Sequence, residues 1–387
     1  RLIGRAFASM HSSKRHRMTD VPVPFLDLTR QIRDLQPEIT RAIEVVCQSG
    51  QIILGPAVER FERDFSAFCG AADGGPAEGI GVGVAEGIGV AEGVGVASGT
   101  DAIWVALEAL GIGPGNEVIT VSHTCVPTVA AILRTGATPV LVDVDPETFT
   151  MDPGHAERAI TDRTRCILPV HLYGQCADLT ALSALAELHG LHLVEDCAQA
   201  AGAEHRGRKA GGFGVAGCFS FYPTKNLGAL GDGGMIVTRD SDLAAEMRRF
   251  RFYGYESNQT SVRSGYNSRL DEIQAACLQV GLGRLTEWNA KRRGWAERYR
   301  DALQGTGLAL PFEAPENRHV YHLFVVRSSE RAQVRDTLQR AGVGSAIHYP
   351  VPVHRQVGYA EHCTVGPGGL EVTERLSEEV FSLPLYP

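Results

Sequence analysis

The sequence predicts an α/β protein with a mixed, mostly parallel sheet flanked by helices, followed by a smaller C-terminal α+β part. From residue 117 onward, short runs rich in β-branched residues alternate with helical stretches. These runs are apolar on both faces, which is typical of strands in a parallel sheet that helices cover on each side. The chain has 387 residues, more than one hydrophobic core usually supports, and its pattern changes near residue 253. We therefore expect two domains.

The expected elements follow one another along the first domain. Strands are predicted at 117–121, 139–143, 166–171, 192–195, 217–221 and 235–238, and helices at 127–134, 155–160 and 179–189. Pro127 lies in the first turn of its helix, where the missing N–H costs no hydrogen bond. A long amphipathic helix over roughly 270–303 follows the change of pattern. The large domain is expected over 21–253 and the small domain over 254–387.

Two segments do not fit this pattern. Residues 1–20 carry basic residues but no apolar stretch of signal-peptide length, so we expect a poorly ordered leader. Three near-identical hexapeptides lie at 77–82, 85–90 and 91–96, and their glycines do not complete a dinucleotide-binding motif. Long surface insertions cost little closure entropy. We expect an insertion over 73–92 outside the packed core, with only the last repeat entering the fold.

The composition argues against several classes of protein. A net charge of −8, from 37 basic and 45 acidic residues, disfavours a nucleic-acid binder. No stretch reaches the roughly 18 uninterrupted apolar residues that a membrane-spanning helix needs. The nine cysteines are odd in number and include no C-x-x-C pair, so neither a metal site nor a disulfide framework is expected. Scattered thiols indicate a reducing compartment, the cytoplasm.

Polar groups that suit chemistry lie just after predicted strands, where open α/β sheets bind their ligands. Gly99 and Thr100 precede an apolar helical run, so they offer N–H groups and a hydroxyl to an anion, although an ordinary helix cap has the same pattern. Asp196 directly follows an apolar strand. A buried carboxylate there needs a donor or a cation as partner, and the alternative is a cap for the next helix.

Lys225 is the candidate nucleophile. The sequence has only four lysines: Lys14 lies in the leader, Lys209 follows a polar turn, and Lys291 stands beside two arginines on a helix. An aromatic strand precedes Lys225 and a glycine-rich segment follows it, so desolvation is expected to lower the pKa of its amine. The alternative is a solvated loop lysine. In this order, an anion site, a strand-end aspartate and such a lysine meet the needs of pyridoxal phosphate.

The sequence resembles the DegT/DnrJ/EryC1/StrS family of pyridoxal-phosphate-dependent sugar aminotransferases from about residue 24 to residue 387. The segment Phe-Ser-Phe-Tyr-Pro-Thr-Lys-Asn-Leu-Gly at 219–228 is close to a family signature. The resemblance implies the aspartate-aminotransferase-like fold of type I, with Lys225 as the catalytic Schiff-base lysine and Asp196 as the partner of the pyridinium. It also implies further cofactor contacts from Gly99, Thr100, Cys125, Ala198, Gln199, Ser220 and Asn267.

The resemblance also implies an assembly and a substrate side. Asn267 would reach the phosphate of a neighbouring subunit, so a homodimer with shared active sites is expected. His348 and Tyr349 resemble the substrate-side motif of the small domain. Cys125 occupies a position where many relatives carry an aromatic residue that stacks on the cofactor, so we expect Cys125 to face the ring and to stack weakly. Most of the hexapeptide repeats have no counterpart in the family.

The expected activity is the transfer of an amino group from an amino acid, L-glutamate or glutamine, to a nucleotide-linked keto-sugar in sugar or antibiotic biosynthesis, with pyridoxamine phosphate as the intermediate form of the cofactor. A cyclitol ketone or an aminobenzoate precursor is the alternative acceptor within the family. A regulatory homologue without turnover is the alternative from another class, and a lyase or desulfurase is a third. Family dehydratases replace the lysine by histidine, and Lys225 argues against that branch.

Overall fold

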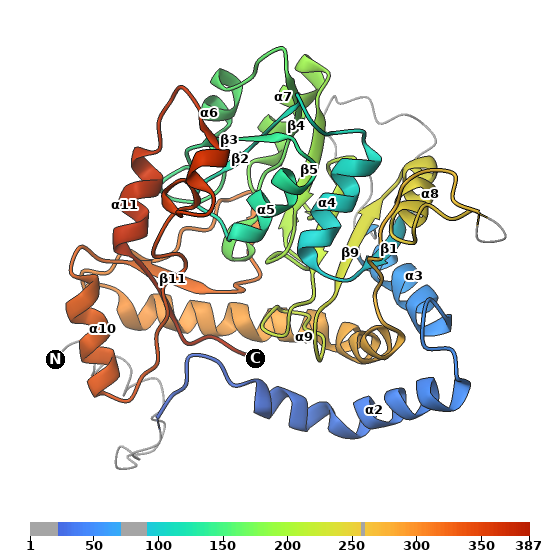
Figure 1. Ribbon diagram of the computed structural model, residues 1–387. Coiled ribbons are helices and arrows are strands. Elements are labelled where there is room, and N and C mark those ends of the chain that lie inside the picture. Colours follow the sequence, from blue (N-terminus) through green and yellow to red (C-terminus); the bar gives the residue numbers. More distant parts are fainter. Residues whose placement is uncertain (1–21, 71–90, 257–259) are drawn as a thin grey trace.

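The computed structural model describes residues 22–70, 91–256 and 260–387, and an eight-stranded sheet forms its centre (Figure 1). In spatial order the strands are β1 (Glu92–Val96), β9 (Gly234–Thr238), β8 (Ala216–Ser220), β5 (His192–Asp196), β4 (Thr164–Ile167), β2 (Glu117–Val121), β3 (Thr138–Val142) and β12 (Thr364–Val365). β9 pairs antiparallel with β1 and β8, and the other pairs are parallel. The expected α/β class with a mixed, mostly parallel sheet is confirmed.

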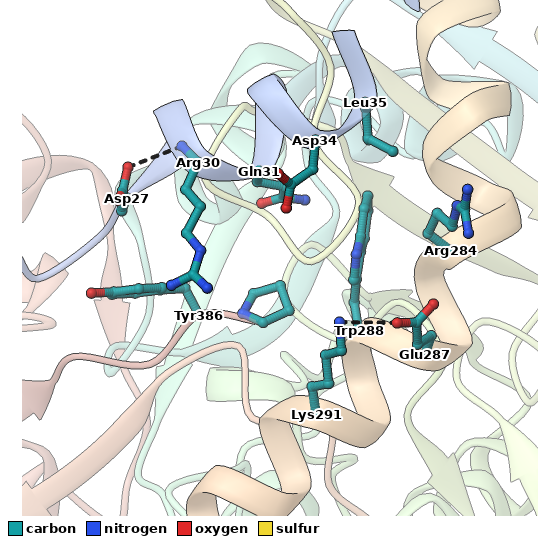
Figure 2. A pocket seen from close by; sticks show the side chains of 11 residues that line it. Asp27, Arg30, Gln31, Asp34, Leu35, Arg284, Glu287, Trp288, Lys291 and Tyr386 are labelled. Atoms are coloured by element: carbon teal, nitrogen blue, oxygen red, sulfur yellow. Dashed lines mark hydrogen bonds and ion pairs between the residues drawn. The ribbon is translucent and has the colours of Figure 1, made fainter. Parts of the chain in front are cut away.

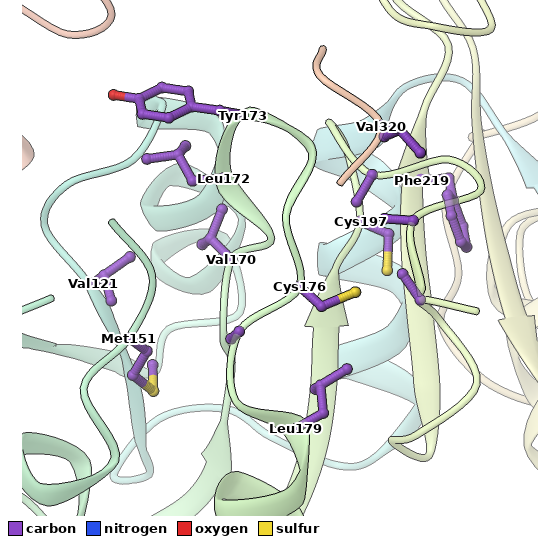
Figure 3. Close-up of a cluster of buried hydrophobic side chains, with 14 of the residues drawn as sticks. Val121, Met151, Val170, Leu172, Tyr173, Cys176, Leu179, Cys197, Phe219 and Val320 are labelled. Carbon is purple, nitrogen blue, oxygen red and sulfur yellow. The ribbon is translucent and has the colours of Figure 1, made fainter. Parts of the chain in front are cut away.

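Helices cover both faces of the sheet. One face carries α4 (Gly99–Ala109), α5 (Val126–Arg134) and α8 (Ser241–Phe250), and the other carries α3 (Pro56–Gly70), α6 (Pro153–Arg158), α7 (Leu179–His189) and part of α9 (Glu272–Leu303). Consecutive strand residues divide between the two cores: Val118 packs on the first face and Ile119 on the second. Figure 3 shows part of the second core, where Val121 and Leu179 are buried. Both faces being buried explains the uninterrupted apolar strands.

The bounds of the predicted elements agree within a few residues, except for the strand expected at 166–171. β4 ends at Ile167, and the chain continues through Pro169 into a 3-10 turn, η1 (Leu172–Gly174). Proline has no N–H to donate to a strand ladder, so regular pairing stops before it. Val170 keeps one isolated bridge to Asp196, which still aligns this segment with β5.

The C-terminal part has its own small core. β11 (Phe324–Arg327) pairs antiparallel with β13 (Val380–Leu383), and α10 (Arg331–Arg340) and the end of α9 pack on them. The elements α2 (Leu28–Ser49) and α9 run side by side below the sheet (Figure 1). Further short elements are β6 (Glu204–His205), β7 (Arg208–Lys209), β10 (Asn317–Arg318), η3 (Val353–Arg355), η4 (Ala360–His362) and α11 (Glu371–Glu379). β12 joins the main sheet beside β3, so the C-terminal part also completes the large sheet.

Two helices receive their N-terminal caps from carboxylates far away in the sequence. Asp143 follows β3, and its oxygens accept the N–H groups of Val372 and Thr373 at 2.8 Å each and the Thr373 hydroxyl at 2.7 Å, at the start of α11. Glu272 accepts the N–H groups of Ala57 and Val58 at 2.9 Å, at the start of α3. Both caps satisfy N–H groups that a helix leaves free, and both fix one segment against another.

The predicted leader, residues 1–20, and most of the predicted insertion over 73–92 lie outside the described residues. Glu92 is the first residue of β1, where it pairs with Thr238 and forms a 2.6 Å ion pair with Arg248. The described part of the last hexapeptide thus belongs to the sheet. Among the residues that the structure describes, no helix has the length and apolar character needed to cross a membrane. The division at residue 253 stays a prediction.

Candidate active site

The candidate site lies at the edge of the sheet where the parallel strands end. Asp196 is the last residue of β5 and Ser220 the last residue of β8. Gly99 follows β1 closely, and Cys125 follows β2. Because these strands run in one direction, their carboxyl ends meet at one edge, and residues far apart in the sequence come together there.

The start of α4 forms an anion cradle. Ser98 caps the helix by accepting the N–H of Asp101 at 3.1 Å, which leaves the first N–H groups, those of Gly99 and Thr100, without partners inside the helix. A side chain on Gly99 would put its Cβ 2.5 Å from the Cβ of Ser220, so only glycine lets the helix start pack on the end of β8. The structure therefore brings Gly99 and Ser220 together, with Thr100 next along α4, and the binding of a phosphate by these residues stays a prediction.

Asp196 is a buried carboxylate with two hydrogen-bond donors. It is 4% exposed, and its oxygens accept the N–H of Ala198 at 3.0 Å and the hydroxyl of Thr128 at 2.8 Å. Burial raises the pKa of Asp196, while these two donors and Lys225 act in the opposite direction. Sequence analysis did not assign Thr128 this part. Its signal is a hydroxyl in the first turn of α5, the helix that follows β2, a strand separated from β5 by β4 alone.

Lys225 lies in the turn after β8. Its N–H donates to the carbonyl of Tyr222 at 2.8 Å, which fixes the turn, and the residue is half-buried. Burial lowers the pKa of the Lys225 amine, and the nearby side chains of Cys125 and Asp196 act in the opposite direction. A lowered pKa increases the fraction of neutral amine, the form that acts as a nucleophile or a base. The pKa of Lys225 thus depends on Asp196 and Cys125 as well as on burial.

Gln199 and Tyr173 attach the loop of His348 and Tyr349 to the sheet edge. The side-chain oxygen of Gln199 accepts the N–H of Tyr173 at 2.7 Å, and its amide nitrogen donates to the hydroxyl of Tyr349 at 3.0 Å. The Tyr173 hydroxyl donates to the carbonyl of His348 and lies 2.9 Å from Nε2 of His123. Tyr173 has a φ of 61°, a left-handed conformation that non-glycine residues rarely adopt and that clusters at functional sites. Sequence analysis missed Tyr173.

His348 is held between the segment that precedes α2 and strand β13. Its ring stacks on Phe25 with centroids 5.7 Å apart, and its Nδ1 lies 2.8 Å from the Ser382 hydroxyl. Burial lowers the pKa of His348 to about 4, and the charge of Lys225 adds to this shift. The imidazole is therefore neutral near pH 7. Burial also raises the pKa of Tyr349 well above its ordinary value, so its phenol stays protonated.

A second contact holds the same loop further along. The Ser122 hydroxyl lies 2.8 Å from Nδ1 of His354 and accepts the His354 N–H at 3.2 Å. On the other side of the ring, Nε2 lies 3.2 Å from a carboxylate oxygen of Glu374. Ser122 precedes Cys125 by three residues and His354 follows Tyr349 by five. This contact therefore fixes both site loops relative to one another.

Asn267 is not with these residues within one chain. It is exposed and forms an isolated antiparallel bridge with Phe252. In the part of the chain that the structure describes, no hydrogen bond joins it to Lys225 or Asp196. The predicted role of Asn267 therefore depends on a second subunit.

Comparison with known proteins places this arrangement in a family. The model of the DegT/DnrJ/EryC1/StrS aminotransferase family matches residues 81–387. The chain belongs to this family. It is 45% identical over 366 residues to the dTDP-3-amino-3,4,6-trideoxy-alpha-D-glucose transaminase of Streptomyces venezuelae, a match that covers 94% of this chain and 91% of that protein. The expected aminotransferase class is thereby confirmed.

Solved structures agree with this assignment. The crystal structure of DesV from S. venezuelae in complex with a ketimine intermediate matches with a TM-score of 0.87 and 45% identity, covering 95% of this chain and 94% of that one. The structure of NtdA from Bacillus subtilis with bound cofactor PMP matches with a TM-score of 0.82 and 30% identity, covering 100% and 88%. The expected type I fold of the aminotransferase is confirmed.

A set of three possible metal ligands lies beneath the aminotransferase site. The ligand atoms of His171, Glu195 and Cys197 lie within 4.8 Å of one another, and all three residues are buried. Nδ1 of His171 accepts the N–H of Ala177 at 3.2 Å, so Nε2 carries the proton and donates to Glu195 at 3.0 Å. Both ring nitrogens are then in use, and the imidazole has no lone pair left for a metal.

Another pocket of the aminotransferase lies between α2, α9 and the C-terminal residues (Figure 2). It has a volume of about 230 Å³, and charged side chains of both signs line it. Lys291 forms a 2.9 Å ion pair with Glu287 there, and Arg284 pairs with Glu38 at 3.1 Å. These cations are compensated within the protein, and the pocket is remote from the strand ends that carry Asp196.

Proposed function

We propose that this aminotransferase binds pyridoxal phosphate at the strand-end edge. The observation that carries the proposal is the combination of a half-buried Lys225, whose amine has a lowered pKa, with the buried carboxylate of Asp196. The anion cradle at Gly99 fits a phosphate group, since the first N–H groups of α4 have no partner inside the helix and Ser220 packs closely beside them. The residues present therefore fit the cofactor.

Pyridoxal phosphate, when bound, supplies an aldehyde for the amino group and a ring that accepts electrons. Lys225 would hold the aldehyde carbon and, once released, move a proton as a neutral amine. Asp196 would accept a hydrogen bond from the ring nitrogen and hold its proton there. Cys125 would face the ring and stack on it weakly, and Ala198 and Gln199 would complete its surroundings.

We infer that the donor is an amino acid, L-glutamate or glutamine, and that the acceptor is a nucleotide-linked keto-sugar. The similarity to a dTDP-amino-sugar transaminase supports this acceptor class. His348 and Tyr349 would face the substrate, because they stand on the loop that Gln199 and Tyr173 hold against the site. A cyclitol ketone or an aminobenzoate precursor would be an alternative acceptor for the same chemistry.

The test is an incubation of holoenzyme with L-glutamate and a panel of dTDP- and UDP-linked keto-sugars, read by mass spectrometry. Amination of a keto-sugar replaces its carbonyl oxygen by an amino group, and only an authentic acceptor gives that mass change. Glutamate alone should shift the cofactor absorbance of the holoenzyme. A holoprotein that shows no shift with any amino acid would instead be a regulatory or binding homologue.

The role of Lys225 has its own test. Borohydride reduction of the holoenzyme followed by peptide mapping should find the cofactor on Lys225. Lys225→Ala should still bind the cofactor through its phosphate and Asp196, and its rate should fall by at least the roughly 10²–10⁴-fold that proton transfer contributes. Lys291→Ala is the matched control because that amine is exposed and paired with Glu287. A cofactor adduct on another lysine would contradict the assignment.

We also propose a homodimer in which Asn267 of one subunit completes the phosphate site of the other. Its exposure beside the likewise exposed Tyr253, Val262 and Tyr266 fits a contact surface. Mixing inactive Lys225→Ala and Asn267→Ala chains tests this arrangement. A hybrid dimer would carry both lesions in one site and none in the other, so activity should return on mixing. No recovery in verified hybrids would contradict shared sites.

We propose the cytoplasm as the location of the enzyme. All nine cysteines are unpaired, and most of them are buried. Free thiols persist in a reducing compartment. Fractionation of the producing cells with an antibody to the chain would test this location.

A further inference from the structure

A small cavity lies directly beside the Lys225 turn. Its volume is about 90 Å³, and its polar lining comes from Thr224, Arg292, His322 and His348, whereas the rest of the lining is apolar. Thr224 precedes Lys225, and His348 belongs to the loop that Tyr173 clamps. The cavity is thus continuous with residues of the candidate active site, and neither the proposed phosphate site nor the Asp196 site includes it.

Arg292 is a buried cation without an acidic partner. It is 3% exposed, and one terminal nitrogen donates to the carbonyls of Tyr321 and His322 at 3.3 Å and of Leu385 at 3.1 Å. In the described part of the chain no carboxylate pairs with it, and its Nε has no hydrogen-bond partner. Burial lowers the pKa of Arg292 to about 10, so the group stays charged near pH 7. A buried cation in this state favours an anion beside it.

The two histidines in the lining add donors but no negative charge. Asn226 uses its amide nitrogen for Asn289 at 2.8 Å and for the Val320 carbonyl at 3.2 Å, so its oxygen accepts from Nδ1 of His322 at 3.2 Å. His348 is neutral near pH 7 for the reasons given above. Thr224 lines the cavity and directly precedes Lys225, so the turn that carries Lys225 forms part of the cavity wall. The polar wall is therefore positive or neutral throughout.

We propose that this cavity is a carboxylate subsite in which Arg292 binds a carboxylate group of the amino-acid donor. The inference rests on the proposed transamination and names its donor site. A cavity of 90 Å³ has the volume of about three waters at roughly 30 Å³ each, enough for a carboxylate on a short stem and too small for a nucleotide sugar. An α-amino acid carries its carboxylate one carbon from the amine that reacts beside Lys225. A positive cavity next to that amine suits this geometry.

The first experiment follows the donor half of the reaction in holoenzyme by cofactor absorbance, under single-turnover conditions. Arg292→Gln should raise the apparent Kd for L-glutamate about 10- to 100-fold, the range for losing a hydrogen bond to a charged group. The reverse half, from the pyridoxamine form with a keto acceptor that has no carboxylate, should change less than twofold. Arg293→Gln is the matched control, because this neighbour pairs with Glu313 at 2.6 Å and does not line the cavity.

A second variant covers the case in which Arg292→Gln does not fold. Leu323→Phe would fill the cavity and leave every polar group in place. It should weaken glutamate binding in the same way and leave cofactor retention unchanged. 4-Aminobutyrate lacks the α-carboxylate, so the preference of the wild type for L-glutamate over 4-aminobutyrate should shrink in both variants. A preference that both folded variants keep would overturn the proposal.

A direct readout needs no turnover. Crystals of the holoenzyme soaked in bromide should show an anomalous peak beside Arg292 that L-glutamate displaces. A peak that persists with glutamate bound, or no peak together with an unchanged Kd in Leu323→Phe, would overturn the donor site, and the persistent peak would mark an adventitious ion only. A wild-type holoenzyme that reacts with no amino acid would overturn the proposed transamination itself, and with it this inference.

Discussion

Glu195 and Asp196 are neighbours in β5, yet the protein treats their carboxylates in opposite ways. Glu195 accepts four hydrogen bonds, from His171 at 3.0 Å and from the N–H groups of Gly211, Phe213 and Gly214 at 2.7–2.8 Å. Although burial alone would raise the pKa of Glu195, these donors lower it. Asp196 accepts two hydrogen bonds, and burial raises its pKa.

The difference follows from the alternation of a strand. Successive side chains point to opposite faces, so Glu195 enters the interior, where it fixes the 211–214 segment, and Asp196 enters the site. A carboxylate that accepts four hydrogen bonds from the protein has no free lone pair for a ligand. A buried carboxylate that accepts only two can still bind a ligand, but its incomplete hydrogen bonding lowers the stability of the fold. Two acids of the same strand can thus be assigned to structure and to chemistry from their hydrogen bonds.

The largest expected effect is on the structural side. Glu195→Ala should lower the free energy of unfolding by about 3–5 kcal/mol, because it leaves the His171 ring and three buried N–H groups unpartnered. Urea denaturation of the holoenzyme measures this change. Glu187→Ala, at an exposed position on α7, is the control and should stay within about 0.5 kcal/mol. A small loss in Glu195→Ala would contradict the assigned role.

The next effect is on the chemical side. Asp196→Asn should lower kcat/KM by about 10²–10³-fold, the range for losing one preorganised electrostatic contact in an active site. The free energy of unfolding of the cofactor-free protein should not fall, because the variant removes a desolvated charge. Steady-state kinetics and urea denaturation of the same preparations measure both quantities. A variant Asp196→Asn that lost stability and kept its activity would show that Asp196 has the structural role and not the chemical one.

The pH dependence of stability should have opposite signs for the two acids. The folded state lowers the pKa of Glu195 from its ordinary 4.5, so its contribution is complete above pH 4.5 and is lost as the pH falls through the lowered value. The folded state raises the pKa of Asp196 from its ordinary 3.8, so its ionised form destabilises the fold above the raised value. Urea denaturation of cofactor-free protein between pH 3.5 and 7 measures both. Glu195→Gln should flatten the acid limb, and Asp196→Asn should gain stability towards pH 7.

A smaller effect is expected at the loop that neither acid touches. His354→Ala removes the ring that contacts both Ser122 and Glu374. The backbone N–H at position 354 still donates to the Ser122 hydroxyl, so the free energy of unfolding should fall by only about 1 kcal/mol. KM for the substrates should rise severalfold while the absorbance of the bound cofactor stays unchanged, because the loops of Cys125 and Tyr349 loosen together. His362→Ala is the exposed control. An altered cofactor spectrum would place His354 nearer the chemistry.

The smallest effect is expected at Cys125. Its thiol is half-buried beside Lys225 and Tyr349 and cannot offer an aromatic face to the cofactor. In Cys125→Phe the rate of cofactor release should therefore stay the same or fall slightly, as measured by dialysis and absorbance. Cys363→Phe, at another half-buried cysteine outside the site, controls for added bulk. Faster cofactor loss in Cys125→Phe alone would show that the slot has no room for a ring.

Sequence reasoning found those site residues whose position depends only on where a strand ends along the chain. Asp196, Ser220 and Lys225 each lie at or just after the end of a strand, and a parallel sheet brings such ends together. The partners that it missed are selected by tertiary packing. Thr128 meets Asp196 across 68 residues, and Tyr173 meets His348 across 175. Periodicity and motif spacing carry no information about which side chains meet over such separations.

The cap that Asp143 supplies to α11 restricts how this chain can be divided. The carboxylate lies directly after β3 of the large sheet, and the N–H groups that need it lie 229 and 230 residues later. A C-terminal fragment expressed alone would begin α11 with those groups unprotected, and a hybrid that takes this helix from a relative would have to take a matching acid after β3 as well. The two segments must therefore be inherited together, although more than 200 residues separate them in the sequence.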